Sequence, residues 1–144
     1  MWYADASFLA SVFGQDANTP AALHWLRTCT VFPIIVSRLT LLEVETAFRA
    51  AVQGGHLTAA EREQARRRME RGFRDGILLQ RELLLHQWFP QAHRITLHAT
   101  PLSTCRALDV LHIAAAVLKK ASGFLSFDHH QKELAEAESL IVAP

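Results

Sequence analysis

The sequence predicts an α/β sandwich built on a mostly parallel sheet. Short apolar runs alternate with longer stretches of helical periodicity, and no repeat, low-complexity tract or linker interrupts the alternation. Strands of a parallel sheet read as short continuous apolar runs because helices cover both faces. The chain has 144 residues and is half hydrophobic, so we expect residues 1–144 to form one domain with its own core.

Five short apolar runs are the candidate strands. They are Met1–Ala4, Phe32–Val36, Ile77–Leu79, Phe124–Phe127 and Leu140–Val142. Runs this short suit buried strands better than helices, which need about 10 residues or more.

Three helices are expected in the first half of the chain. One covers Thr19–Thr28 and has a proline in its first turn. The next covers Leu39–Gln53 and ends at a pair of glycines. Its apolar side chains share one face: Leu41, Val44, Phe48, Ala51 and Val52. A third begins at Thr58, where Thr58 and Glu61 match a capping box, and continues through an arginine-rich stretch to Gly72 or beyond.

Three more helices are expected in the second half. The segment Leu83–His98 has helical periodicity, although Pro90 should kink or split it. The segment Ala107–Lys120 is apolar nearly all round, which predicts a buried helix. A last short helix follows Asp128.

Three aspartates occupy positions where a negative charge is costly. Asp5 follows the first predicted strand and Asp128 follows the fourth, and the carboxyl ends of parallel strands are where α/β folds place their sites. Asp109 lies in the first turn of the most apolar helix, so it needs a cation or several hydrogen-bond donors. We therefore expect these acids at one edge of the sheet.

Two glutamates on one helix have different environments. Glu43 lies at the border of the apolar face, whereas Glu45 is about 200° away on the helix. Glu45 shares the outer face with Arg49, and the two are predicted to form a solvated i,i+4 ion pair. Only Glu43 is thus a candidate for the site.

Four converging carboxylates would repel one another and raise their pKa values, and a divalent cation would relieve the repulsion. Oxygen ligands indicate Mg²⁺ or Mn²⁺, as one or two ions, that activate water for phosphodiester hydrolysis. Cys29 and Cys105 are too few for a cysteine-built zinc site or a disulfide framework. The alternative is a set of separate helix caps and surface acids that never meet.

Four strings carry a resemblance to a known family. They are Tyr3–Leu9 (YADASFL), Ser37–Glu45 (SRLTLLEVE), Arg106–Ala116 (RALDVLHIAAA) and Phe124–Asp128 (FLSFD). In their order and spacing they resemble the PIN-domain nucleases, especially the VapC toxins of bacterial toxin–antitoxin modules. The third string is fairly specific and the set of four is strong, whereas the region from Gly54 to Pro101 is far less diagnostic.

This resemblance implies a PIN-like three-layer sandwich with four or five parallel strands flanked by helices. It also implies a magnesium- or manganese-dependent endoribonuclease, a small antitoxin that binds and inhibits it, and a homodimer. The metal ligands and catalytic residues that the resemblance implies are Asp5, Glu43, Asp109 and Asp128. Ser7 and Ser126 match the family's small hydroxyl residues and are expected to hydrogen-bond to these acids.

His112 stands one turn after Asp109, and an Asp-x-x-His pair is able to ligate a metal. A hydrogen-bonded histidine beside the acidic pocket is favoured, because all-oxygen sites suit magnesium. His129 and His130 are expected in a solvated loop, and Trp25 and Trp88 in core or dimer contacts.

Two interpretations of the arginine-rich segment 62–74 stay open. It is either a solvated helix with many ion pairs or a surface that contacts RNA phosphates or the antitoxin. The net charge of +1 neither supports nor excludes a nucleic-acid partner, because local patches determine binding.

Two functions compete with the nuclease. One is an acidic-pocket signalling module, which lacks a lysine at a late strand end: Lys119, Lys120 and Lys132 all fall on predicted helices. The other is a catalytically silent PIN fold that only binds a partner. The N-terminus has no basic region and no apolar run long enough for a membrane, so we expect a cytoplasmic protein.

Overall fold

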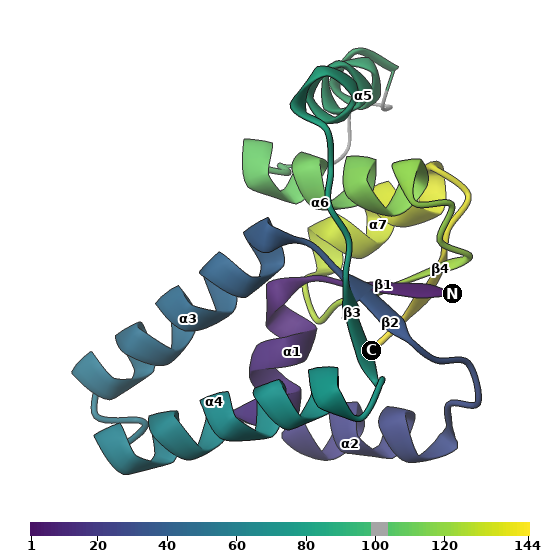
Figure 1. Cartoon of the computed structure of the whole chain (residues 1–144). Helices are drawn as coiled ribbons and strands as arrows, with labels where there is room; N and C mark the ends of the chain where they lie inside the picture. The colour runs from purple at the N-terminus through teal and green to yellow at the C-terminus, as the bar shows by residue number, and fades with distance from the viewer. Residues whose placement is uncertain (99–103) are drawn as a thin grey trace.

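The structure, a computed structural model that describes residues 1–98 and 104–144, has five parallel strands in one sheet. The strands are β1 (Trp2–Ala4), β2 (Ile34–Val36), β3 (Leu78–Gln80), β4 (Gly123–Leu125) and β5 (Ile141–Ala143), in the spatial order β3-β2-β1-β4-β5. The helices within the described residues are α1 (Ala6–Phe13), α2 (Thr19–Thr28), α3 (Arg38–Gln53), α4 (Ala59–Arg74), α5 (Leu85–His98), α6 (Ala107–Leu118) and α7 (His129–Ala137) (Figure 1). The predicted α/β fold class is confirmed.

The central strand β1 divides the core in two. Successive side chains of a strand point to opposite faces, so Tyr3 and Ala4 enter different layers. Tyr3 packs with Ile35 of β2 and Phe124 of β4, its partners in the parallel register. Ala4 lies on the other face with the core residues of α1, α3 and α4.

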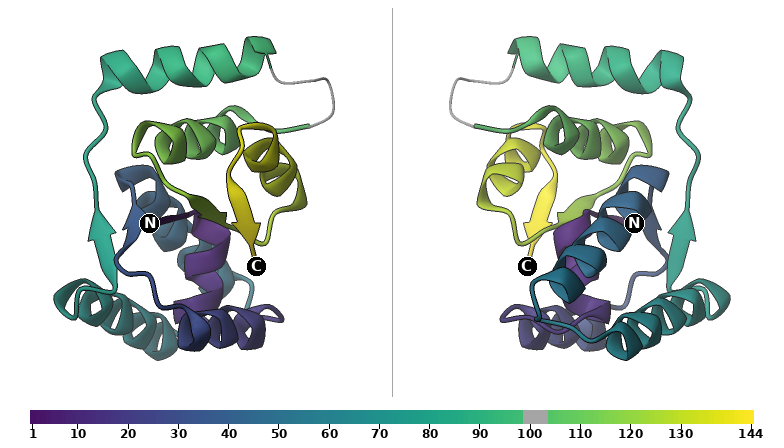
Figure 2. Two further views of the ribbon diagram at one scale, coloured as in Figure 1. Left: turned by 90° about the vertical axis from the view of Figure 1, so that its right-hand side faces the viewer. Right: turned by 90° about the vertical axis from the view of Figure 1, so that its left-hand side faces the viewer.

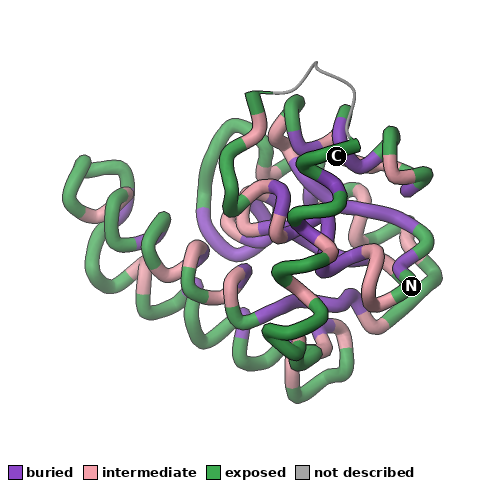
Figure 3. Tube along the Cα trace, turned by 90° about the horizontal axis from the view of Figure 1, so that it is seen from above, coloured by how far each residue is buried: buried purple, intermediate pink, exposed green. Residues whose placement is uncertain are grey.

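The helices form the two outer layers of the sandwich. Helices α1 to α4 supply the core residues of one face, and α5 to α7 supply those of the other. Helix α5 packs on α6 and is the outermost element on its side (Figure 2). Buried residues concentrate in the middle of the molecule, where strands and inner helix faces meet (Figure 3). None of the helices in the described part of the chain is long and apolar enough to cross a membrane.

One helix, α1, was not predicted from the sequence. Helix α1 follows β1 directly, and Asp5 caps it by accepting a hydrogen bond from the amide of Phe8 at 2.9 Å. The signals were an aspartate N-cap and the buried residues Phe8, Leu9 and Val12, at helical spacing. A run of eight residues is short for a periodicity argument, which explains the omission.

Several predicted boundaries are wrong by a few residues. Pro90 does not split α5, because His86 and Pro90 are exposed and water can satisfy the carbonyl group that the proline leaves without a donor. Helix α6 ends at Leu118, before Lys120 adopts a left-handed backbone with φ 53°. His129 and His130 open α7 instead of lying in a loop.

Candidate active site

Asp5 lies at the carboxyl end of the central strand and is 1 % exposed. Its carboxylate accepts hydrogen bonds from Ser7 Oγ at 2.8 and 2.9 Å, and from Ser126 Oγ at 2.7 Å. Burial raises the pKa of Asp5 above its ordinary value, and the opposing effects of His112 and of these hydrogen bonds do not cancel the rise. The predicted hydrogen bonds from Ser7 and Ser126 are therefore present.

The two serines also join two strand ends. Ser7 Oγ accepts a hydrogen bond from the amide of Phe127 at 2.8 Å, and Ser126 Oγ accepts one from the amide of Asp128 at 2.9 Å. Since β1 and β4 are neighbours, these contacts fix the start of α1 against the segment that leads into α7. Asp5 is thus held by one serine from α1 and one from the segment that follows β4.

Glu43 projects from α3 toward α6, where its carboxylate pairs with Nε2 of the buried His112. The other ring nitrogen of His112 is 3.0 Å from the hydroxyl of Tyr3. Burial raises the pKa of Tyr3, so this hydroxyl stays protonated. A continuous chain of hydrogen bonds thereby connects Glu43 to the central strand.

The Tyr3 hydroxyl has two further partners at the start of α3. Ser37 Oγ lies at 2.9 Å and Thr40 Oγ1 at 3.2 Å, and both side chains also form the capping box of the helix. The N-terminus of α3 is therefore anchored to β1 by polar contacts inside the core. This anchoring fixes the position of α3 and therefore the direction in which the Glu43 side chain projects.

Asp109 and Asp128 meet through a third residue, Gln131. The side-chain amide of Gln131 donates to Asp109 Oδ1 at 3.1 Å, and its backbone amide donates to Asp128 Oδ1 at 2.9 Å. Asp109 also accepts from the amide of Arg106 at 2.7 Å, and Asp128 is the N-cap of α7. Both acids therefore have a structural partner at a helix start, as expected for carboxylates near helix N-termini.

The four acids form two groups. Asp5 and Asp128 are connected through Ser126, and Gln131 extends the connection from Asp128 to Asp109. Glu43 stands apart with His112. Within residues 1–98 and 104–144, no three His, Cys, Asp or Glu side chains are arranged so that they could hold a metal ion. The predicted convergence of all four acids on one cation stays a prediction.

Two observations bear on whether the residues fit a divalent cation. Asp5 is a buried carboxylate, and in the described residues none of the ion pairs neutralises it. Gln131 Oε1 is buried without a hydrogen-bond partner among the same residues. Together with the other acids, these oxygens are the hard donors that Mg²⁺ and Mn²⁺ prefer. The donor set fits such an ion, although Glu43 and Asp109 now contact protein groups.

Mutual repulsion of the acids is the expected cause of a raised carboxyl pKa, and for Asp5 this cause is wrong, because the charged group that acts on its pKa is His112, which lowers it. The pKa of Asp5 is raised, but loss of water on burial is the largest cause. Burial follows from the position of Asp5 between the central strand and α1.

Glu43 and Glu45 contact different helices, although their side chains are similarly exposed at 28% and 32%, and the predicted partner of Glu45 is wrong. Glu45 pairs with Arg66 at 2.9 Å and with Arg62 at 3.2 Å, both on α4. The folded chain places α4 beside α3, so arginines distant in sequence are better placed than Arg49. The arginine-rich segment is accordingly a helix with ion pairs, and its exposed cations leave a contact with RNA or a partner open.

Tyr3 and Gln131 belong to the candidate site but were not predicted from the sequence. Tyr3 lies in a predicted apolar strand, yet its hydroxyl joins β1, α3 and α6. Gln131 occupies the first turn of α7, three residues after the cap Asp128, and is only 6 % exposed. That spacing was the available signal for Gln131, whereas nothing in the sequence indicated where the Tyr3 hydroxyl would lie.

Comparison with known proteins places the fold and the sequence in one family. Residues 2–137 match the PIN domain. The chain is 30% identical to Ribonuclease VapC35 of Mycobacterium tuberculosis, in two strains, over an alignment of 149 residues that covers all of this chain and 97% of the relative.

Two solved structures share the fold over their whole length. Mycobacterium tuberculosis VapC20, described as a Sarcin-Ricin loop cleaving toxin, has a TM-score of 0.71 at 15% identity and full coverage of both chains. FitAcB from Neisseria gonorrhoeae has a TM-score of 0.70 at 16% identity, with 100% of this chain and 97% of that chain covered. With residues 2–137 matched to the domain, this chain belongs to the PIN-domain family.

Proposed function

We propose that this protein is a metal-dependent endoribonuclease and the toxin of a toxin–antitoxin pair, as its relative Ribonuclease VapC35 is a ribonuclease. The observation that carries the proposal is Asp5, a buried carboxylate at the carboxyl end of the central parallel strand. A buried charge without a cation is unfavourable, and two serine hydroxyl groups nevertheless hold it in place. Such an arrangement suits a carboxylate whose role is to bind a catalytic metal ion.

Asp5, Glu43, Asp109 and Asp128 are the residues that would hold Mg²⁺ or Mn²⁺. When bound, such an ion supplies a hydroxide nucleophile and neutralises charge on the phosphodiester. One ion or two would serve this chemistry. The proposal does not need a side-chain nucleophile, and it assigns the four carboxylates to binding and orientation.

The remaining polar residues position these carboxylates. Ser7 and Ser126 fix the orientation of Asp5, and Gln131 fixes the separation of Asp109 and Asp128. His112 holds Glu43 and is itself fixed by the Tyr3 hydroxyl. Hydrogen bonds of this kind determine how strongly ligands bind a metal and how well they are oriented.

The proposal extends to partners and place of action. We assign RNA as the substrate and a small antitoxin protein as the inhibitor, and we expect the toxin to act in the cytoplasm as a homodimer. Exposed apolar side chains on α5, namely Leu85, Phe89 and Leu97, are a surface that such a protein contact would cover.

A cleavage assay tests the activity. Purified protein is incubated with a panel of structured and single-stranded RNAs in chelator-treated buffer, with and without added Mn²⁺ or Mg²⁺. We expect cleavage only with metal, and none with Asp5→Asn protein prepared in parallel. Metal-independent cleavage that Asp5→Asn leaves unchanged would remove the proposed mechanism.

A further inference from the structure

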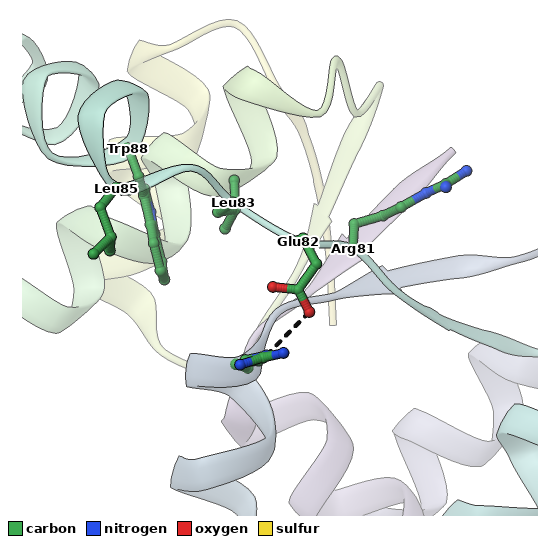
Figure 4. A pocket seen from close by; sticks show the side chains of 6 residues that line it. Arg81, Glu82, Leu83, Leu85 and Trp88 are labelled. Carbon is green, nitrogen blue, oxygen red and sulfur yellow. Dashed lines mark hydrogen bonds and ion pairs between the residues drawn. The ribbon is translucent and has the colours of Figure 1, made fainter.

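A second polar cluster lies at the same edge of the sheet as the acids. A cavity of about 240 Å³ is lined by Arg38, Arg81, Glu82, Leu83, Leu85 and Trp88 (Figure 4). Arg38 is the first residue of α3, and Glu82 follows the carboxyl end of β3 by two residues. Drug-sized ligands occupy pockets of about 300–1,000 Å³, so this cavity suits a smaller group such as one nucleobase.

Trp88 is a fixed aromatic wall of this cavity. Its indole N–H donates to the carbonyl oxygen of Leu111 at 2.7 Å, so the ring is held against α6. Leu111 directly precedes His112, the partner of Glu43, and this places the ring near the candidate active site. Exposed bases of single-stranded RNA stack on aromatic side chains, and a ring fixed in advance loses little entropy when a base binds.

Glu82 supplies an oriented acceptor in the cavity. Its Oε1 accepts from Arg38 Nε at 3.0 Å and from Gln80 Nε2 at 3.1 Å. Among the described residues, none donates to Oε2, which keeps its acceptor capacity. In Figure 4, Glu82 and Trp88 project to the same side of their segments, whereas Arg81 projects away from them.

The donors and acceptors of the cavity match one base. Guanine is the base whose pairing edge presents two adjacent donors, N1–H and N2–H, followed by an acceptor, O6. A carboxylate accepts from the two donors through its two oxygens, so a bound guanine would take the place of the Gln80 amide at Glu82 Oε1 and place its second donor at Oε2, while a guanidinium donates to O6. Adenine, cytosine and uracil each place an acceptor where the carboxylate would repel it. The Glu82 carboxylate and the Arg38 guanidinium therefore present the complementary order of groups.

We propose that Arg38, Glu82 and Trp88 form a guanine-binding subsite that selects the RNA position cut at the neighbouring acids. This inference rests on the proposed ribonuclease function and gives it a sequence preference. Trp88 stacks on the base, Glu82 reads its donor edge, and Arg38 orients Glu82 and contacts O6. The residues are matched to a single-stranded base, because a paired guanine would not expose this edge.

Binding without cleavage tests the subsite. Pentanucleotides UUGUU and UUAUU are titrated into the full chain in chelator, and tryptophan fluorescence is followed. We expect UUGUU to bind about 10-fold more tightly than UUAUU and to quench the emission. Trp2 and Trp25 pack against each other and the core, so Trp88→Phe protein should lose most of the quenching.

Substitution of the reading residue gives the second test. Glu82→Gln should reduce the preference for UUGUU over UUAUU to less than about threefold, because the amide cannot accept both donors. Glu70→Gln removes the same charge at an exposed position of α4 and should leave the preference unchanged. The readout is the ratio of the affinities for UUGUU and UUAUU, since loss of a negative charge raises the affinity for both RNAs.

Cleavage and binding results separate the two proposals. No preference for guanine in the wild type, or an unchanged preference in Glu82→Gln, overturns the subsite even if the protein cleaves RNA. Guanine-selective binding that depends on Glu82 supports the subsite even if cleavage is absent, in which case the proposed nuclease activity fails. Absence of binding to either RNA also overturns the inference.

Discussion

Asp5 and the pair Asp109–Asp128 represent two ways of placing a carboxylate at the edge of a sheet. Asp5 is almost fully buried, accepts hydrogen bonds from two serine hydroxyl groups, and has a raised pKa. Asp109 and Asp128 are partly exposed at the starts of α6 and α7, where backbone amide groups donate hydrogen bonds to their carboxylates. All three also contribute to helix capping.

The difference shows which carboxylate positions local helix capping explains and which depend on the tertiary structure. A carboxylate at a helix start is favoured by the helix itself, so capping alone would account for Asp109 and Asp128. Capping alone does not account for the burial of Asp5, because removal of water disfavours its charged form.

Asp5→Asn and Asp109→Asn should each abolish metal-dependent RNA cleavage while the fold is retained. Asparagine keeps the size and the capping ability of aspartate but removes the negative charge that a cation requires. Cleavage is measured on a labelled RNA, and circular dichroism checks the fold. Wild-type rates in Asp109→Asn with loss only in Asp5→Asn would mean that Asp109 is a cap and nothing more.

Glu43→Gln should lower the cleavage rate at least about 100-fold, more than the loss of a residue that only supports a ligand. Glu45→Gln, two residues along α3, should be almost silent. Glu45 forms half-exposed ion pairs with Arg62 and Arg66, and surface pairs contribute only about 0–1 kcal/mol. Rates and melting temperatures of the two variants are compared side by side. Equal loss of activity in both would contradict the separation of the two glutamates.

Ser126→Ala should lower cleavage by about 10- to 100-fold, because the hydroxyl group orients Asp5. Ser122→Ala is the matched control, since Ser122 lies at the opposite end of β4 and bonds to Met1. The cleavage rate at saturating Mn²⁺ and the Mn²⁺ concentration at half-maximal rate are measured for both. A Ser126→Ala enzyme with both values unchanged would show that Asp5 does not need this hydrogen bond.

The smallest expected effect concerns stability. The pKa of Asp5 is higher in the folded protein than in the unfolded chain. The contribution of protonated Asp5 to the free energy of unfolding is therefore fully present below the unfolded pKa, about 3.9, and is lost as pH rises through the folded pKa. In chelator, Asp5→Asn protein should therefore melt above wild type near neutral pH, and the difference should shrink toward acid pH.

Metal should act in the opposite direction. At a Mn²⁺ concentration 100 times its Kd, the wild type should gain about 2.7 kcal/mol, and Asp5→Asn should gain much less. Thermal melts across a pH series and a Mn²⁺ titration measure both effects. A wild type whose melting temperature does not respond to millimolar Mn²⁺ would contradict a metal site at these four acids.

Local patterns in the sequence determined most of the secondary structure. The capping box of Thr58 and Glu61 starts α4 as expected, and the face of Val44 and Phe48 in α3 is buried. Five apolar runs predicted five strands, each within three residues of its place. These features succeed because caps and apolar periodicity act over a few residues and need no knowledge of the partner element.

The sequence by itself indicated which carboxylates are candidates for the site, but it did not indicate which groups they contact. Asp5 is a candidate because it follows a strand, and Glu43 because it lies at the border of an apolar face; in the structure Glu43 contacts His112. The chain topology decided the rest: β1 lies between β2 and β4, so Tyr3 reaches α3 and α6, and Ser126 reaches Asp5. Hydrogen bonds between residues more than 30 positions apart depend on how the strands are ordered, and no local pattern encodes that order.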